Sequence, residues 1–309
     1  MIKSQFALLQ RELWEHRALY VTPAVIALLV SLMSLTGQVS IHGHGIEELI
    51  DTGIVAASNV PESMRAAAIS GILIGLSTTF VFAMWIMTIF YTLDSLYAER
   101  RDRSILFWRS IPSTDFETVL SKLLTAVVVI PLITFAVIIA THLIVMLITS
   151  VWLMARGGSA WHLIWSSAPF FDNWTATLVF LLALPMWMSP FIGWFLFVSA
   201  FTKRSPLLTA FLPIAMLPIF EKILFDSTVF VEAFFIRTVK MPLFIDVDNM
   251  ELLFQGDDLY ERFANESISL FTLMDLGGFL ANGGLWIGMI VCGLFTTAAI
   301  YVRRYRDDS

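Results

Sequence analysis

Hydrophobic positions along this chain fall into long runs separated by shorter polar stretches. A helix needs about 20 mainly apolar residues to cross the hydrocarbon core of a bilayer, and six runs are long enough to do so. These runs comprise residues 18–37, 69–93, 119–151, 174–201, 206–225 and 279–302. The pattern therefore predicts an all-α integral membrane protein with six transmembrane helices.

Prolines interrupt several of these runs. The fifth run contains Pro213 and Pro218 and carries the weakest signal of the six. Other runs contain prolines at positions 23, 131, 185 and 190. Proline removes a backbone donor and bends a helix, and a membrane helix tolerates it where neighbouring helices satisfy the freed backbone groups. Kinks are expected at these positions.

A shorter amphipathic stretch, residues 2–17, precedes the first run. One helical face of this stretch is apolar, formed by Ile2, Phe6, Leu9 and Leu13. This spacing predicts a helix that lies in the membrane interface. The predicted organisation is an interfacial helix over 1–17 and a six-span domain over 18–309. The alternative for 1–17 is a simple extension of the first span.

Lysine and arginine predict the orientation. If the N-terminus is cytoplasmic, the inner segments hold 13 of the 19 basic residues. These are Lys3, Arg11, Arg17, Arg100, Arg101, Arg103, Arg109, Lys122, Lys203, Arg204, Arg303, Arg304 and Arg306. Inner loops of membrane proteins carry such an excess, so both termini are expected in the cytoplasm.

Composition agrees with a membrane protein. The 309 residues are 58% hydrophobic and 14% charged, with a mean hydropathy of +0.79, which is too apolar for a soluble globular protein. The single cysteine, Cys292, excludes an intramolecular disulfide. No basic stripe lies outside the segments that flank the membrane, so nucleic-acid binding is not expected.

The polar segment between the second and third runs has an unusual composition. Residues 94–117 alternate acidic and basic side chains at spacings that allow ion pairs on a helix, and Phe107 and Trp108 lie among them. The segment predicts a docking surface, with a short helix roughly parallel to the membrane. Ser113 or Thr114 is expected to cap the helix that follows.

Motifs that carry chemistry are absent from the sequence. There is no Walker A motif, so the chain is not expected to hold a nucleotide phosphate. HExxH, GxSxG and CxxC are also absent. The loop around His42 and His44 offers imidazoles near acidic residues, but two histidines in a loop fix no ligand geometry, and no metal site is expected. Glycines near the last run, including Gly284 and Gly288, predict close helix packing.

A weak substrate path is predicted from deformable or polar residues within the spans. Methionine suits a pocket for varied apolar ligands, and His142 is the one ionisable side chain clearly inside a span. The candidates are Met84, Met87, Met186, Met188 and His142. Each has a structural alternative: the methionines facing lipid or other helices, and the histidine hydrogen-bonded inside the bundle. Residues 226–278 are acidic but rich in phenylalanine and leucine, which predicts a small helical cap outside the membrane.

The polar segment between the second and third runs, residues 94–117, resembles the corresponding part of the membrane subunits of ABC transporters of the ABC-2 type. The resemblance lies in Asp94, Glu99, Arg100, Asp102, Arg103, Ser104, Phe107, Trp108, Arg109, Ser110, Ile111, Pro112, Ser113, Glu117, Leu120, Ser121 and Lys122, leading into a span. A last span that runs into Arg303 and Arg304 is also similar to this family. With the six-span plan and the interfacial helix, the resemblance covers nearly the whole chain.

The resemblance implies a permease, most often an exporter, in the cytoplasmic (inner) membrane of a bacterium. Two permease subunits, as a homodimer or heterodimer, would assemble with two copies of a separate ATPase that binds ATP and magnesium. This chain itself would be no enzyme and bind no cofactor. A cytoplasmic coupling helix would dock in the ATPase through Glu99, Arg100, Arg101, Asp102, Arg103, Ser104, Phe107, Trp108, Arg109 and Ser110.

Two other functions stay open from the residues alone. A stand-alone secondary transporter or channel would need ionisable groups at mid-membrane, which are scarce here. A membrane assembly factor would use the outer segment 226–278 to recruit a protein.

Overall fold

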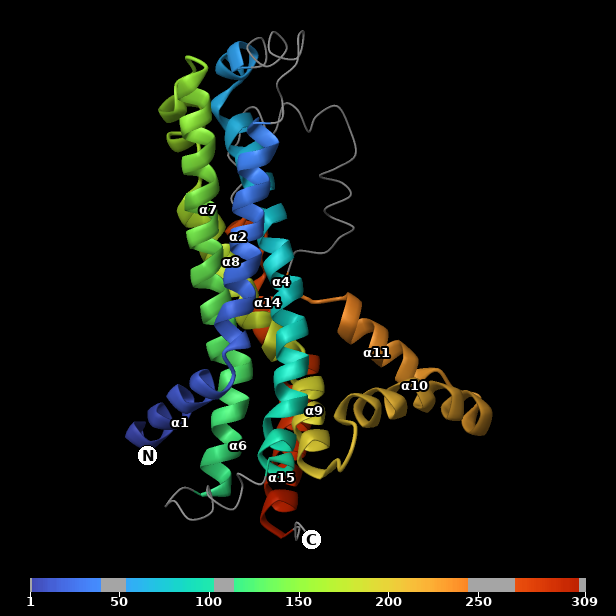
Figure 1. Cartoon of the computed structure of the whole chain (residues 1–309). Coiled ribbons are helices and arrows are strands. Elements are labelled where there is room, and N and C mark those ends of the chain that lie inside the picture. The colour runs from blue at the N-terminus through green and yellow to red at the C-terminus, as the bar shows by residue number, and fades with distance from the viewer. Residues whose placement is uncertain (1, 40–53, 103–113, 244–269, 306–309) are drawn as a thin grey trace.

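A computed structural model describes residues 2–39, 54–102, 114–243 and 270–305, and within these ranges every regular element is a helix. The long helices lie side by side in an upright bundle (Figure 1). The bundle contains α2 (Ala18–Val39), α4 (Glu62–Arg101), α7 (Ile130–Ala155), α8 (Phe170–Trp187), α9 (Ser189–Phe201) and α15 (Gly283–Tyr305). Among the described residues five helices are long and apolar enough to cross a membrane, or six if α8 and α9 form one span. The predicted all-α class is confirmed, and the number of membrane-length apolar helices agrees with the predicted multi-pass layout.

The third predicted span begins with a capped helix. In α6 (Asp115–Leu124) the Thr114 hydroxyl accepts a hydrogen bond from the Glu117 amide at 3.1 Å, and the Glu117 carboxylate accepts one from the Thr114 amide at 3.1 Å. This reciprocal pair satisfies two amides that the first turn of a helix leaves free. Of the two predicted caps, Thr114 is the one used.

A five-residue π-helix, η1 (Thr125–Val129), joins α6 to α7, so Asp115 to Ala155 is one candidate span of 41 residues. Pro131 lies at the start of α7. Proline lacks an N–H, and a wider turn on its N-terminal side accommodates the lost hydrogen bond. The predicted irregularity at Pro131 is therefore present as a π-helical stretch.

The fourth predicted span is broken. Helices α8 and α9 meet at Met188 and are bent by 56° relative to each other. Pro185 lies in the last turn of α8, and Pro190 in the first turn of α9. Two prolines five residues apart explain why the helix breaks here, as the sequence predicted.

Helix α4 is longer than the second hydrophobic run. It begins at Glu62, ends at Arg101 and is 40 residues long, and it includes Asp94 to Arg101. The expectation of a separate short helix from Asp94 is therefore wrong for residues 94–101, because the backbone hydrogen bonds of α4 continue through them without a break. Residues 103–113 lie outside the described residues.

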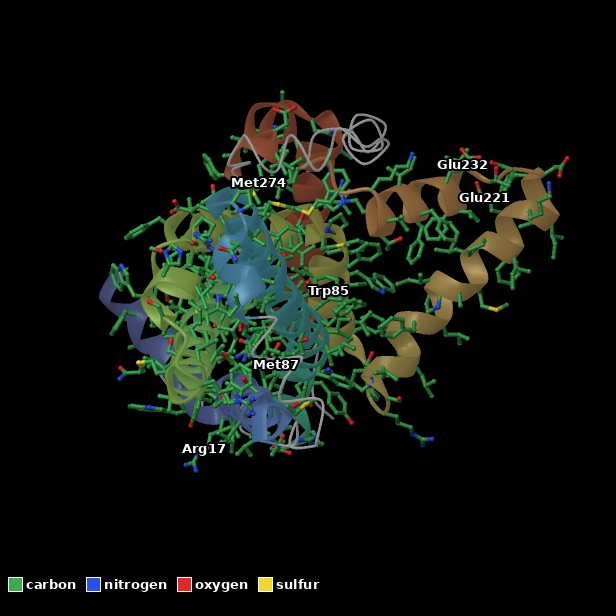
Figure 2. All side chains as sticks on the ribbon, turned by 90° about the horizontal axis from the view of Figure 1, so that it is seen from above. Arg17, Trp85, Met87, Glu221, Glu232 and Met274 are labelled. Carbon is green, nitrogen blue, oxygen red and sulfur yellow. The ribbon has the colours of Figure 1, made fainter. Side chains whose placement is uncertain are left out.

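Two parts of the chain leave the bundle sideways. Helix α1 (Ile2–Glu15) projects at an angle from the foot of α2 (Figure 1), as expected for a helix distinct from the first span. On the opposite side, α10 (Pro206–Phe225) and α11 (Val229–Val239) form a hairpin that extends away from the other helices (Figures 1 and 2). Helix α10 is the predicted fifth span and has the required length and hydropathy.

Part of the predicted outer cap is packed into the bundle. The short helix η3 (Phe271–Leu273) lies in the described part of segment 226–278, and α14 (Leu276–Ala281) begins there. The Asp172 carboxylate accepts a hydrogen bond from the Leu270 amide at 2.7 Å, and Phe279 is buried with its ring 6.4 Å from that of Trp187. These contacts hold the entry to α15 against α8.

Helices α9 and α15 approach each other closely at a glycine. A Cβ atom on Gly193 would lie 2.8 Å from the Cα of Cys292, so the backbones are nearly in contact at this point. The glycine of α9 thus provides the close packing that small residues allow in membrane helices.

Candidate functional site

Where α1, α4, α6 and α15 meet, a group of charged side chains is buried or half-buried. We call it the base network, and it comprises Arg11, Glu12, Glu99, Asp115, Lys122 and Arg303. It contains three acidic and three basic residues, so their formal charges cancel. The network lies at the end of the bundle where the chain leaves α4 for segment 103–113 and returns at α6.

Lys122 lies at the centre of the base network. Its side chain is 0% exposed, and its ammonium nitrogen lies 2.9 and 3.2 Å from the two carboxylate oxygens of Glu12 and 3.0 Å from Glu99. A buried charge is costly unless it is paired and hydrogen-bonded. Two carboxylates from two other helices meet this requirement, so Lys122 ties α6 to both α1 and α4.

Glu99 links α4 to the two ends of the chain. Its carboxylate contacts Lys122, lies 2.7 Å from the Arg11 guanidinium and accepts a short hydrogen bond from Arg303. Arg303 also donates to Asp115 at 2.9 Å. Because Glu99 lies in the last turn of α4 and Asp115 in the first turn of α6, Arg303 binds both sides of segment 103–113.

A tyrosine and a histidine extend the network along α1. The Tyr91 hydroxyl donates to Glu12 at 2.8 Å, and the His16 ring packs edge-on against Tyr91 at 5.0 Å between centroids. Burial lowers the pKa of His16, although Glu12 opposes the shift. His16 is therefore neutral at pH 7.

Glu12, Glu15 and His16 form a group with the composition of a metal site, because their ligand atoms lie within 4.8 Å of one another. However, both oxygens of Glu12 already accept hydrogen bonds from Lys122. A buried ammonium beside the same carboxylate repels a divalent cation. The arrangement therefore favours an ion pair over a metal site.

The structure places the predicted coupling residues in three different environments. Glu99 is only 4% exposed and lies inside the base network. Arg100 is half-buried and donates to the carbonyl oxygens of Ser199 and Thr202. The expectation that both lie on the docking surface is corrected, because their charged groups point into the protein and are held there.

Arg101 and Asp102 are exposed, as a docking surface requires, and their side chains pair with each other at 2.9 Å. The other predicted coupling residues lie outside the described residues: Arg103, Ser104, Phe107, Trp108, Arg109 and Ser110.

Residues of the predicted substrate path are not brought together. Met84 is 0% exposed in the core beside Phe80, and Met87 is buried in the same core. Met186 and Met188 pack in a different cluster, which includes Phe279 of α14. Among the described candidates, Met188 also lines a cavity.

His142 is buried in the bundle, as its structural alternative proposed. Its Nε2 lies 3.4 Å from the Ser77 hydroxyl, and its Nδ1 accepts a hydrogen bond from the Trp174 indole at 3.3 Å. Both ring nitrogens therefore have partners. This leaves the imidazole no free nitrogen with which to bind a substrate.

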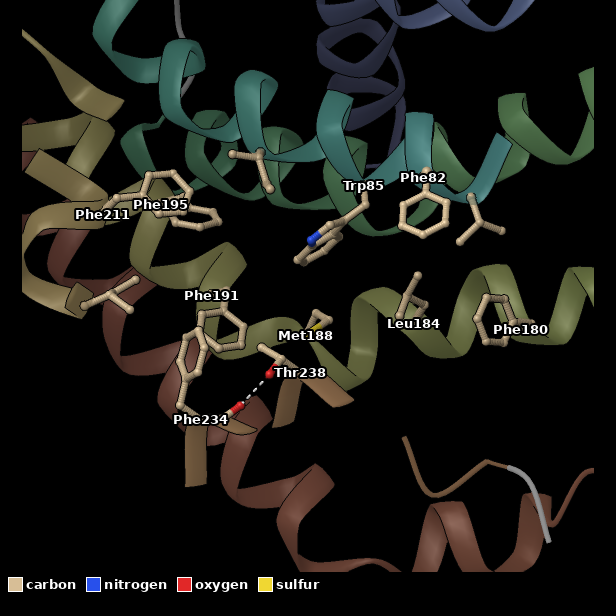
Figure 3. A pocket seen from close by; sticks show the side chains of 13 residues that line it. Phe82, Trp85, Phe180, Leu184, Met188, Phe191, Phe195, Phe211, Phe234 and Thr238 are labelled. Atoms are coloured by element: carbon tan, nitrogen blue, oxygen red, sulfur yellow. Dashed lines mark hydrogen bonds between the residues drawn. The ribbon is translucent and has the colours of Figure 1, made fainter. Parts of the chain in front are cut away.

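The cavity beside Met188 has a volume of about 330 Å³. It lies between α4, the α8–α9 bend and the α10–α11 hairpin, and aromatic rings point into it from several of these helices (Figure 3). Trp85 of α4 faces Met188 and Leu184 across it. Among the described residues, the polar groups of its lining are the Thr238 hydroxyl and the Trp85 indole nitrogen.

Sequence reasoning missed the base network. Glu12 and Tyr91 carry no motif, and the residues that pair lie 23 to 204 positions apart. One signal was available: Lys122 lies beside hydrophobic residues at the start of a span, where a charge needs a partner.

Comparison of the chain with protein-family models, curated proteins and solved structures finds no match.

Proposed function

We propose that this chain is the transmembrane permease subunit of an ABC transporter of the ABC-2 type, an exporter in the cytoplasmic membrane of a bacterium. The base network carries the proposal. It joins the last turn of α4 and the first turn of α6, which flank segment 103–113, to α1 and α15. A docking segment transmits force only if its two ends are attached to the helices that must move.

The proposed topology has six spans with both termini in the cytoplasm. The spans are α2, α4, α6–α7, α8–α9, α10 and α15. Their length and hydropathy support this layout, as does the excess of basic residues in the segments assigned to the inside. Helix α10 would serve as the fifth span, which requires it to lie more nearly along the bundle than in Figure 1.

In the proposed mechanism, two permease subunits assemble with two copies of an ATPase. The ATPase binds ATP and magnesium, and this chain performs no chemistry. When the ATPase pair closes, it moves segment 103–113. Because Lys122 and Arg303 bind residues on both sides of the segment, α4 and α6 move as one body with α1 and α15. This movement would switch the transmembrane pathway of the assembled permease pair between opening to the inside and opening to the outside of the membrane.

The structure suggests a division of roles within the coupling segment. Glu99 and Arg100 hold the base of the segment, because both are occupied by contacts inside the chain. The exposed Arg101 and Asp102 and the residues beyond them would contact the ATPase. Phe107 and Trp108 would provide the apolar anchors, since buried aromatic residues dominate binding at interfaces.

The first test is capture of the partner. The tagged full-length chain, purified from its native membrane, should bring with it a protein that contains a Walker A motif. Trp108→Ala should weaken this association roughly 30-fold, the effect of removing a hot-spot side chain. Glu232→Ala is the matched control, because Glu232 is exposed on α11 near the tip of the hairpin, on another part of the molecule.

A second variant separates docking from transmission. Lys122→Met should keep the ATPase bound but uncouple ATP hydrolysis from conformational change in the permease, followed by fluorescence of a probe attached to α15. If the wild-type chain captures no ATPase, the proposed function is wrong. If Trp108→Ala binds the ATPase as well as wild type, the docking assignment is wrong.

A further inference from the structure

Another cavity, which we call the Arg65 cavity, lies between the start of α4 and the end of α7. Its volume is about 310 Å³, at the lower end of the range for ligand-binding cavities. The helix η2 (Trp161–Trp165) and the helical stretch 54–59 form its other sides. The lining consists of Ile54, Ala57, Arg65, Thr149, Trp152, Leu153, Leu163 and Ile164. None of these residues belongs to the α10–α11 hairpin, so the cavity does not depend on the position of the hairpin.

The Arg65 cavity lies at the opposite end of the bundle from the base network. Arg65 and Glu99 are near opposite ends of α4, a helix of 40 residues (Figure 1). Such a helix extends about 60 Å, twice the thickness of the hydrocarbon core, which is about 30 Å. With the base network at one membrane surface, the cavity therefore lies at the level of the other.

Apolar side chains around the Arg65 cavity face the surroundings of the protein. Val55, next to Ile54 of the lining, is 61% exposed, and Trp161, the first residue of η2, is 72% exposed. Trp152 lies in the lining itself. Tryptophan is enriched where a membrane protein meets the lipid head groups. The surface around the cavity is therefore suited to contact with lipid rather than with water, so we expect its ligand to come from the bilayer.

Arg65 is the cation of the lining, and the protein binds two of its three guanidinium nitrogens. Nε donates to the Ser167 hydroxyl at 3.2 Å, and Nη1 donates to the Val60 carbonyl at 2.6 Å. Nη2 makes no hydrogen bond among the described residues, and it is not one of the buried polar atoms that lack a partner, so it remains accessible. A guanidinium stays charged in proteins. Arg65 is thus held in place with one nitrogen free to bind an anion.

The lining favours a ligand with a net negative charge. Among the described lining residues there is one guanidinium and no carboxylate, so a zwitterionic head group would find no partner for its ammonium. An arginine nitrogen binds a phosphate oxygen through a charge-assisted hydrogen bond. The other polar groups are the Thr149 hydroxyl and the Trp152 indole nitrogen, and the remaining side chains are aliphatic. This combination matches a phosphate next to the glycerol and first methylene groups of a phospholipid.

We propose that the Arg65 cavity binds the head group of an anionic phospholipid, phosphatidylglycerol, with a phosphate oxygen at Nη2 of Arg65. The acyl chains stay in the surrounding bilayer. In the proposed topology this lipid belongs to the outer leaflet. The site goes beyond the proposed function, because it assigns a lipid to the end of the bundle that is remote from the coupling segment. The bound lipid would join α4 to α7 and η2, the helices that line the cavity.

The test uses phosphatidylglycerol with a photoactivatable diazirine near the carboxyl end of one acyl chain. The full-length protein is placed in nanodiscs of phosphatidylcholine with this probe, irradiated and digested, and the labelled peptides are identified by mass spectrometry. Labels are expected on peptides that contain residues 54–65, 149–153 or 161–164. Unlabelled phosphatidylglycerol should compete at least tenfold better than phosphatidylethanolamine, because only the former lacks an ammonium. Glycerol 3-phosphate in solution should not compete, because it has no acyl chains.

Arg65→Gln should weaken competition by phosphatidylglycerol about 10- to 100-fold, the factor expected for a hydrogen bond to a charged group. Arg65→Lys keeps the positive charge and should retain part of the preference for phosphatidylglycerol. Arg17→Gln is the matched control, because Arg17 is exposed at the break between α1 and α2, near the other end of the bundle. This control should leave the labelling and the competition unchanged.

Four results would overturn the proposal: equal competition by the two phospholipids, unchanged competition in Arg65→Gln, labels only outside the cavity, or competition by glycerol 3-phosphate equal to that of the lipid. The last result would make the cavity a site for a water-borne phosphate. If Arg65→Gln fails to fold, the head-group series on the wild-type protein decides alone. The measurement needs no ATPase, so a negative result removes the lipid site and leaves the permease assignment intact.

Discussion

Replacement of Lys122 by methionine tests whether the base network holds the helices together. Methionine is close to lysine in length but carries no charge, so the variant removes the cation from a fully buried position with little change in packing. Glu99 retains Arg11 and Arg303. Glu12 loses its ammonium partner and keeps the hydrogen bond from the Tyr91 hydroxyl, with His16 and the more distant Arg11 charge nearby.

The expected loss is about 3–5 kcal/mol in the free energy of unfolding, because removal of one partner from a buried ion pair leaves an uncompensated charge. Much of this loss should come from Glu12. Adding Glu12→Gln to Lys122→Met removes that charge and should restore at least about 2 kcal/mol, a coupling that a double-mutant cycle measures directly.

The assay is reversible unfolding in mixed micelles, followed by tryptophan fluorescence. Lys222→Met is the control, because Lys222 is 61% exposed and pairs with Asp226 at i,i+4 on the hairpin. Its loss should be no more than about 0.5 kcal/mol. A Lys122→Met protein within about 1 kcal/mol of wild type would refute the reasoning, as would a double variant less stable than Lys122→Met alone.

Three further changes probe other parts of the fold. Gly193→Leu should destabilise the protein by about 1–3 kcal/mol through overpacking, because even a Cβ atom at this position would lie 2.8 Å from the Cα of Cys292. The same unfolding assay measures this loss. Gly293→Ala is the control, because the space around Gly293 is open. Thr114→Ala removes the α6 cap and should cost about 1 kcal/mol, detected also as faster amide exchange in the first turn of α6. Because burial lowers the pKa of His16, the unfolded chain binds a proton more readily, so stability should fall as the pH drops below about 6.5. His16→Gln should flatten this dependence in thermal unfolding between pH 5 and 8, and an unchanged slope would contradict the assignment.

Much of the fold was predictable because helix formation in a membrane protein is a local property. Runs of about 20 apolar residues specify spans whatever their neighbours are, and each of the six predicted runs corresponds to a described helix or bent pair. The break near Met188 was signalled by Pro185 and Pro190, and the start of α6 by Thr114 and Glu117. Each signal acts within one or two helical turns.

The candidate site was less predictable, because its residues come together only through packing. Glu99 looked like a surface residue in a charged segment. Its burial depends on Arg11 from α1 and Arg303 from α15, at opposite ends of the chain. The continuation of α4 to Arg101 also turned Glu99 inward, since a helix fixes the direction of each side chain, whereas a loop does not.

The sequence by itself determined the helical class of this protein with its membrane-length apolar runs, the break near Met188, and the charged segment between its second and third hydrophobic runs. Tertiary structure alone decided which charges are buried partners and which methionine faces a cavity. The physical reason is the distance along the sequence over which each interaction acts. Hydrophobicity, proline and capping act over a few neighbouring residues, whereas a buried ion pair depends on which helices meet, and helix packing sets that from the whole chain at once.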